Sequence, residues 1–160
     1  MLNQEIHYIT PAVTPLCPDG QIDFESCATL YNYLIAGGVD GIVVLGSIGE
    51  FFAFTMQQKK DLVRFAVETV QHRVPVIVGT TSMVFDEIVE LSNYSIDLGA
   101  EAVMIIPPYY FYHTDESVIE YYSRLAEEIH GDVYLYNFPD RTGYEISPVV
   151  VRKLAERHAN

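Results

Sequence analysis

Five short apolar runs alternate with longer amphipathic stretches along the chain. The runs are HYITPAVTP near the start, GIVVLG (41–46), VPVIVGT (74–80), AVMIIPP (102–108) and VYLYNF (133–138). Each run is nearly continuous in apolar residues, which is typical of parallel strands buried on both faces. They recur at roughly thirty-residue intervals, the length of one strand–helix unit. The pattern therefore predicts five βα units in succession.

The stretches between the first three runs carry helix signals. Asp23 is placed to cap a helix that ends at the glycine pair 37–38. Thr55 and Gln58 form a capping box, which starts a second helix that runs toward His72. Both stretches are therefore predicted to be helical.

The later stretches also read as helices. Gly99 closes a third helix. The apolar residues of the fourth repeat at steps of four, three and four, and they are Val118, Tyr122, Leu125 and Ile129. Gly131 follows as the expected C-cap of that helix. Ser147 with Pro148 at the first helical position opens a last helix through Leu154.

This alternation predicts an α/β protein with a parallel sheet, forming a single domain over residues 1–160. Periodicity alone leaves two architectures open: a doubly wound open sheet, or the first five βα units of a (β/α)₈ barrel. A complete barrel takes about 250 residues. In both folds, ligands bind beyond the carboxyl ends of the strands, so the residues at those ends are the candidates for chemistry.

Composition limits the classes of partner. The chain has 22 acidic and 9 basic residues and a net charge of −13, which argues against nucleic acid as a partner. No apolar stretch approaches the length of a membrane span, and the start lacks the features of a signal peptide. We therefore expect a cytoplasmic protein with no membrane partner. The two cysteines and five histidines show no metal-binding spacing, so no metal site is expected.

The sequence GSIGE follows the second predicted strand. It matches neither common phosphate-binding glycine motif, and no lysine follows it. Its glycines would let the backbone approach a ligand or adopt positive φ, and so present N–H groups to a small carboxylate, although an ordinary turn explains them equally well. Glu50 is a candidate general base, but its place before a helix favours a structural role.

The fourth and fifth runs end in aromatic loops. Tyr136 ends the fifth strand, where a core position is the ordinary role for a tyrosine. Arg141 lies in the turn that follows; it is suited to bind a carboxylate through two hydrogen bonds, although a solvated arginine is the default. The loop after the fourth strand holds Tyr109, Tyr110 and Tyr112, and a run this aromatic indicates a pocket or a subunit contact.

Taken together, these motifs resemble the dihydrodipicolinate synthase / N-acetylneuraminate lyase family of pyruvate-dependent aldolases. The matching segments are GVDGIVVLGSIGEF, the PPYY after the fourth run, and YNFPDRTG followed by the helix that starts at Ser147-Pro148. The resemblance covers the whole chain, and these segments stand in the expected order and spacing. The resemblance favours the (β/α)₈ barrel and implies an enzyme that forms a Schiff base between a lysine on the sixth strand and pyruvate, with no cofactor.

The resemblance also implies roles for individual residues. Tyr136 matches the tyrosine that assists proton transfer to and from the imine, and Ser47 matches the hydroxyl of the proton relay. Tyr110 matches the relay tyrosine that reaches into a neighbouring subunit's site, so a homo-oligomer, a dimer or tetramer, is expected. The backbone of Ser47, Ile48 and Gly49 would hold the pyruvate carboxylate. Arg141 falls where these synthases place an arginine for the second substrate's carboxylate.

Two features depart from the family pattern. Ile48 stands where many members have a threonine that hydrogen-bonds pyruvate, which leaves room for a 2-keto-3-deoxy-sugar-acid aldolase. The only lysines are Lys59, Lys60 and Lys153, all on predicted helices. The expectation is therefore a pyruvate-dependent aldolase, acting on a 2-keto acid and an aldehyde, represented by a fragment that lacks the Schiff-base lysine and is inactive alone. The alternative is a non-catalytic α/β module that binds a keto acid or pairs with another chain.

Overall fold

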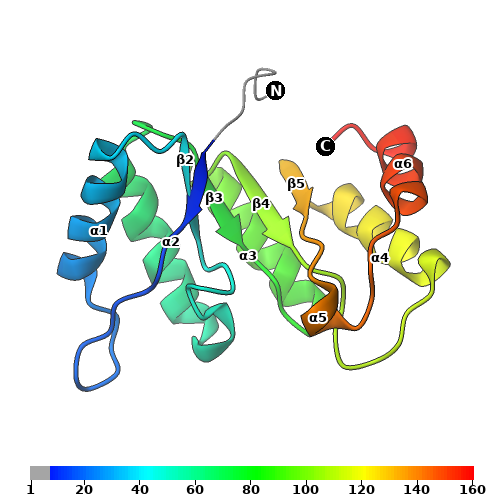
Figure 1. The fold of residues 1–160 in the computed structure, drawn as a ribbon, viewed down its shortest axis with the longest axis horizontal. Coiled ribbons are helices and arrows are strands. Elements are labelled where there is room, and N and C mark those ends of the chain that lie inside the picture. The colour runs from blue at the N-terminus through cyan, green and yellow to red at the C-terminus, as the bar shows by residue number, and fades with distance from the viewer. Residues whose placement is uncertain (1–7) are drawn as a thin grey trace.

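The computed structural model describes residues 8–160, which form one five-stranded parallel sheet (Figure 1). The strands are β1 (Ile9–Pro11), β2 (Gly41–Val44), β3 (Val76–Gly79), β4 (Ala102–Ile105) and β5 (Asp132–Leu135). They pair in chain order, each parallel to the next. A doubly wound sheet reverses its strand order partway, whereas a barrel wall does not. The observed order therefore confirms the first five βα units of a barrel; His7, in the first predicted run, lies outside the described residues.

Each strand is followed by a helix, and the helices form an arc around one face of the sheet (Figure 1). The longer helices are α1 (Phe24–Ala36), α2 (Met56–Val70), α3 (Phe85–Asp97), α4 (Asp115–Glu128) and α6 (Pro148–Arg157). Two short helices lie at the carboxyl ends of strands: the 3₁₀ helix η1 (Phe51–Ala53) after β2 and α5 (Pro139–Thr142) after β5. The predicted turn around Arg141 is thus a single helical turn.

The predicted N-caps are confirmed. The Asp23 side chain accepts a hydrogen bond from the Ser26 N–H at the start of α1. Thr55 and Gln58 form both halves of a capping box on α2, and Ser147 caps α6 with Pro148 in its first turn.

The prediction that Gly131 caps α4 is wrong. The helix ends at Glu128, and Ile129 is the C-cap with an extended backbone. Gly131 instead leaves room for the Ile96 side chain of α3, because a Cβ at this position would lie 2.6 Å from Ile96 Cδ1 and the isoleucine would have to move. Glycine is favoured both where a helix packs closely against a strand and at a helix C-cap, so the sequence alone does not show which of these two roles Gly131 has.

The two faces of the sheet differ in their environment. On the helix side, residues such as Ile42, Val44 and Val78 join the main core. On the opposite face, Val43 and Ile77 belong to a small apolar cluster with Ala102. The alternation follows from the two-residue period of a strand.

The ends of the sheet depart from the prediction of strands buried on both faces. β2 and β3 are buried throughout, but residues of β5 alternate between exposed and half-buried. β1 and β5 form the edges of the sheet in the described part of the chain. None of the helices within residues 8–160 has the length and apolar character needed to cross a membrane.

Candidate functional site

Ser47 and Tyr136 come together at the carboxyl ends of β2 and β5. Ser47 Oγ lies 3.5 Å from Tyr136 Oη, within hydrogen-bonding reach, and either oxygen is able to donate. The Tyr136 N–H donates to the Ile105 carbonyl at 2.9 Å, which fixes the backbone just past the end of β5. The Tyr136 ring stacks on Phe138 with centroids 5.5 Å apart. The sheet therefore brings together two hydroxyls that are far apart in sequence.

The backbone that carries Ser47 is shaped by its flanking residues and not by its glycines. Leu45 and Glu50 have positive φ, at 55° and 54°, whereas Gly46 and Gly49 do not. Of the two roles that glycine allows in this motif, positive φ is therefore adopted by neither Gly46 nor Gly49. A β-carbon at Gly79 of the neighbouring strand would lie 2.1 Å from the Leu45 carbonyl oxygen. Gly79 is thus required for the unusual turn at Leu45, which sequence inspection missed.

Gly49 seats the loop against the segment after β1. A β-carbon at Gly49 would lie 3.1 Å from the Ala12 carbonyl oxygen. The Thr14 hydroxyl donates to the Gly49 carbonyl at 2.9 Å. Within residues 8–160, the N–H groups of Ser47, Ile48 and Gly49 donate to no protein acceptor. These contacts therefore fix the loop; Ser47 and Ile48 line the cavities described below, whereas Gly49 is buried and lines neither.

Glu50 precedes η1 as its N-cap, but its side chain makes no capping hydrogen bond. The residue is exposed, and its carboxylate lines neither of the cavities described next. Its structural contribution is the left-handed backbone at the end of the GSIGE motif.

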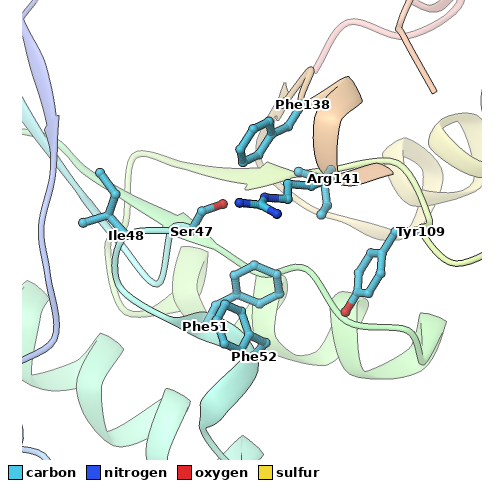
Figure 2. Close-up of a pocket in the computed structure, with 8 residues that line it drawn as sticks. Ser47, Ile48, Phe51, Phe52, Tyr109, Phe138 and Arg141 are labelled. Atoms are coloured by element: carbon cyan, nitrogen blue, oxygen red, sulfur yellow. The ribbon is translucent and has the colours of Figure 1, made fainter. Parts of the chain in front are cut away.

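Two connected cavities open at this edge of the sheet and share Ser47 and Ile48. The inner cavity, about 370 Å³, lies on the concave face of the sheet and includes Tyr136 in its wall. The outer cavity, about 520 Å³, is shown in Figure 2. Its walls are Ser47, Ile48, Phe51, Phe52, Ile106, Tyr109, Phe138 and Arg141.

Arg141 projects from α5 into the outer cavity. Figure 2 shows its guanidinium group directed toward the Ser47 side chain. Among the described residues, no acidic side chain forms an ion pair with it. The helical turn that carries Arg141 is held by Thr142, whose single O–H lies within donating distance of two carbonyl oxygens, those of Phe138 at 3.1 Å and Tyr144 at 2.9 Å. The site therefore presents one cation, on an ordered helical turn, to an anionic ligand.

Tyr110 does not lie in either cavity of its own chain. Its side chain is 87% exposed and its φ is 92°. The next two residues, Phe111 and Tyr112, are also largely exposed. The neighbouring Tyr109 lines the outer cavity instead. The sequence predicted an aromatic contact here but did not show which tyrosine faces the site of the same chain.

The three lysines lie away from both cavity walls. Lys59 is buried in α2 with its ammonium group 5.9 Å from the Phe51 ring centroid. Burial lowers the pKa of Lys59, and the charge of Glu87 opposes that effect. Lys60 pairs with Glu90, and Lys153 is exposed on α6. Across residues 8–160, no three His, Cys, Asp or Glu side chains are grouped as metal ligands would be.

Known proteins resemble this chain in sequence and in fold. Residues 5–160 match the Dihydrodipicolinate synthetase family. The chain is 38% identical to the putative 2-dehydro-3-deoxy-D-gluconate aldolase YagE of Escherichia coli K12 over 95% of its length and 50% of the relative's. It is 37% identical to a 4-hydroxy-tetrahydrodipicolinate synthase of Clostridium perfringens over 90% of its length and 49% of the relative's.

Solved structures agree with this assignment. Dihydrodipicolinate synthase from Aquifex aeolicus superposes with a TM-score of 0.92 at 30% identity, covering 96% of this chain and 52% of that one. YagE from E. coli K12, solved in complex with pyruvate, gives a TM-score of 0.91 at 37% identity over the same shares. The chain spans about half the length of the curated relatives that it matches. By sequence and by fold, it belongs to the dihydrodipicolinate synthetase family.

Proposed function

We propose that this chain supplies the carboxylate-binding and proton-relay part of a pyruvate-dependent Schiff-base aldolase. The observation that carries the proposal is the Ser47–Tyr136 hydroxyl pair, 3.5 Å apart at the wall of the inner cavity. Ser47 also shares the outer cavity with Arg141, which has no acidic partner within residues 8–160. Two hydroxyls in contact are able to pass a proton between a bound keto acid and its surroundings.

The keto acid is placed in the inner cavity. Its carboxylate accepts hydrogen bonds from the N–H groups of Ser47, Ile48 and Gly49, which have no protein acceptor within the described residues. Ile48 adds only an apolar side chain at this point, so the backbone replaces the hydrogen bond of a side-chain hydroxyl. A charge-assisted hydrogen bond contributes about 1.5–3 kcal/mol, so the keto acid is expected to bind weakly to this loop alone.

The reaction forms or breaks a carbon–carbon bond next to an imine, which acts as an electron sink. Tyr136 exchanges a proton with the reacting atoms and Ser47 relays it. Tyr110, exposed on the loop after β4, completes the relay in a second subunit of a homo-oligomer. Arg141 holds the carboxylate of the aldehyde partner in the outer cavity.

The imine-forming lysine is proposed to lie outside these 160 residues. Lys59, Lys60 and Lys153 all sit on helices, and none of them reaches the wall of either cavity. The 160-residue chain is therefore expected to bind the keto acid without forming a covalent adduct.

Titration of the ¹⁵N-labelled chain with pyruvate tests the proposal. The largest amide shifts are expected at Ser47, Ile48 and Gly49. They should saturate at millimolar pyruvate and be reversed by dilution. Lactate, which keeps the carboxylate but lacks the ketone, is the matched ligand for separating carboxylate binding from keto-acid selectivity. Shifts confined to other segments, or no shifts at roughly tens of millimolar pyruvate, would refute the binding of the pyruvate carboxylate at residues 47–49.

A further inference from the structure

The outer cavity has an unusual lining for a site that takes polar aldehydes. Six of its eight wall residues are aliphatic or aromatic: Ile48, Phe51, Phe52, Ile106, Tyr109 and Phe138. Although the chain has 22 acidic residues, none of those within residues 8–160 lines this cavity. The wall of the outer cavity thus carries a positive charge, whereas the chain as a whole has a net charge of −13.

The polar groups of the wall are few and lie close to one another. Figure 2 shows the Arg141 guanidinium directed toward Ser47, with the rings of Phe51, Phe52 and Phe138 around them. Arg141 is the one charged residue of the wall. A ligand that matches this arrangement carries one negative group and an apolar body.

Two of the apolar wall residues are also strongly exposed. Phe52 is 68% exposed and Ile48 is 55% exposed, although both line the cavity. A ligand with an apolar body would remove this surface from water. A polyhydroxylated ligand would instead place hydroxyls against rings that offer them no hydrogen bond, which costs binding free energy.

We propose that the outer cavity selects an aldehyde partner that bears a carboxylate on an aromatic or branched apolar body, and that it disfavours polyhydroxylated aldehydes. This inference rests on the proposed function, in which the inner cavity holds the keto acid. The new bond joins the methyl carbon of the keto acid to the aldehyde carbon. The methyl carbon loses one proton and the aldehyde oxygen gains one, so the step needs no oxidant or reductant.

Binding of small probes to the 160-residue chain tests this selection without catalysis. The probe is 4-(hydroxymethyl)benzoate, which has a ring and a carboxylate but forms no imine with lysines. Glycerate keeps the carboxylate on a hydroxylated body, and benzyl alcohol keeps the ring without the charge. Isothermal titration should show 4-(hydroxymethyl)benzoate binding at least about tenfold more tightly than either comparison ligand.

Two variants with matched controls locate the effect. Arg141→Gln should remove the advantage of 4-(hydroxymethyl)benzoate over benzyl alcohol, whereas Arg157→Gln, at an exposed position on α6, should retain it. Phe52→Ala should lower the affinity for 4-(hydroxymethyl)benzoate by about fivefold and leave the affinity for glycerate unchanged. Tyr33→Ala, which removes a 75% exposed ring on α1, should change neither of these affinities.

The outcomes separate this inference from the proposed function. If glycerate binds as tightly as 4-(hydroxymethyl)benzoate while pyruvate still shifts residues 47–49, the selection is wrong and the aldolase proposal stands. If the aromatic probe binds through Arg141 but pyruvate does not bind at residues 47–49, the aldolase proposal fails and the preference of the cavity stands. If no probe binds, the inference is overturned.

Discussion

Ser47 Oγ lies 3.5 Å from Tyr136 Oη although the two residues are 89 positions apart in the chain. Two strands, β3 and β4, lie between the strands that carry them. The hydroxyls therefore meet only because the parallel sheet curves and brings the carboxyl ends of β2 and β5 toward each other. The proposed chemistry depends on this pair.

Replacing the Tyr136 hydroxyl tests its role directly. In the native protein, if the proposed aldolase reaction is correct, Tyr136→Phe should lower kcat by about 100-fold or more, since a positioned proton donor contributes roughly 10²–10⁴-fold. The ring still stacks on Phe138, so the free energy of unfolding should fall by no more than about 1 kcal/mol. Steady-state kinetics and urea unfolding check the two expectations. Unchanged kcat would leave Tyr136 a packing residue.

The Ser47 hydroxyl should act in the same proton relay as Tyr136. If the two residues form one relay, Ser47→Ala in the Tyr136→Phe background should lower kcat much less than Ser47→Ala does alone. Additive losses across this double-mutant cycle would mean that Ser47 and Tyr136 act independently.

Gly79 should be essential to the geometry of the loop before Ser47. Gly79→Ala would place a methyl group 2.1 Å from the Leu45 carbonyl oxygen, so β3 or the Leu45 turn must move. We expect a loss of about 1–3 kcal/mol in stability together with weaker pyruvate binding. Gly46→Ala is the matched control, because its nearest atom, Cγ1 of Val43, lies at 3.5 Å. Equal effects of the two variants on stability would contradict the close contact.

The loop that follows Arg141 is tied to the start of α4. Tyr144 Oη donates to Asp115 Oδ1 at 2.6 Å, and Ser147 Oγ donates to the other carboxylate oxygen at 3.3 Å. Tyr144→Phe should reduce stability by about 1–2 kcal/mol and weaken carboxylate binding at Arg141. Tyr33→Phe, at an exposed tyrosine, is the control. Denaturation and probe titration report the two effects; stability lost without weaker binding would show that the link does not position Arg141.

The buried Lys59 should make the free energy of unfolding increase as pH rises toward the ordinary lysine pKa of 10.5. Burial lowers its folded-state pKa below the ordinary value of 10.5. Between these two values the unfolded chain binds more protons than the folded chain, so the Lys59 contribution to stability rises with pH. Lys59→Met should therefore stabilise the protein most at neutral pH, and its advantage should shrink as pH approaches 10.5. Denaturation of both proteins from pH 7 to 10 measures this, with Lys153→Met as a charge-only control. An advantage that grows with pH would contradict it.

Much of the fold could be predicted from local pattern. Nearly continuous apolar runs indicated the five strands, and the caps at Asp23, Thr55 and Ser147 began helices where the structure has them. The GSIGE and YNFPDRTG segments were correctly placed at strand carboxyl ends, because parallel strands leave their ends on one edge. The barrel wall itself was favoured by the family resemblance and not by periodicity.

The details of the site depended on long-range contacts that local pattern does not carry. Leucine does not favour positive φ, so the turn at Leu45 and the role of Gly79 on the next strand were not visible in the sequence. The adjacent residues Tyr109 and Tyr110 have the same local signal, but Tyr109 is half-buried in the cavity wall and Tyr110 is exposed. The aromatic wall formed by Phe51, Phe52 and Phe138 combines segments from two loops, and only the folded sheet brings them together.

Trapping with pyruvate and borohydride tests the central claim most directly. The protein isolated from its native source, at whatever chain length it has there, is reduced with pyruvate present and analysed by peptide mass spectrometry. We expect one reduced pyruvyl adduct on a lysine other than Lys59, Lys60 and Lys153, and no adduct on the isolated 160-residue chain. A native protein of about 18 kDa that gains no adduct, or an adduct on Lys153, would contradict it.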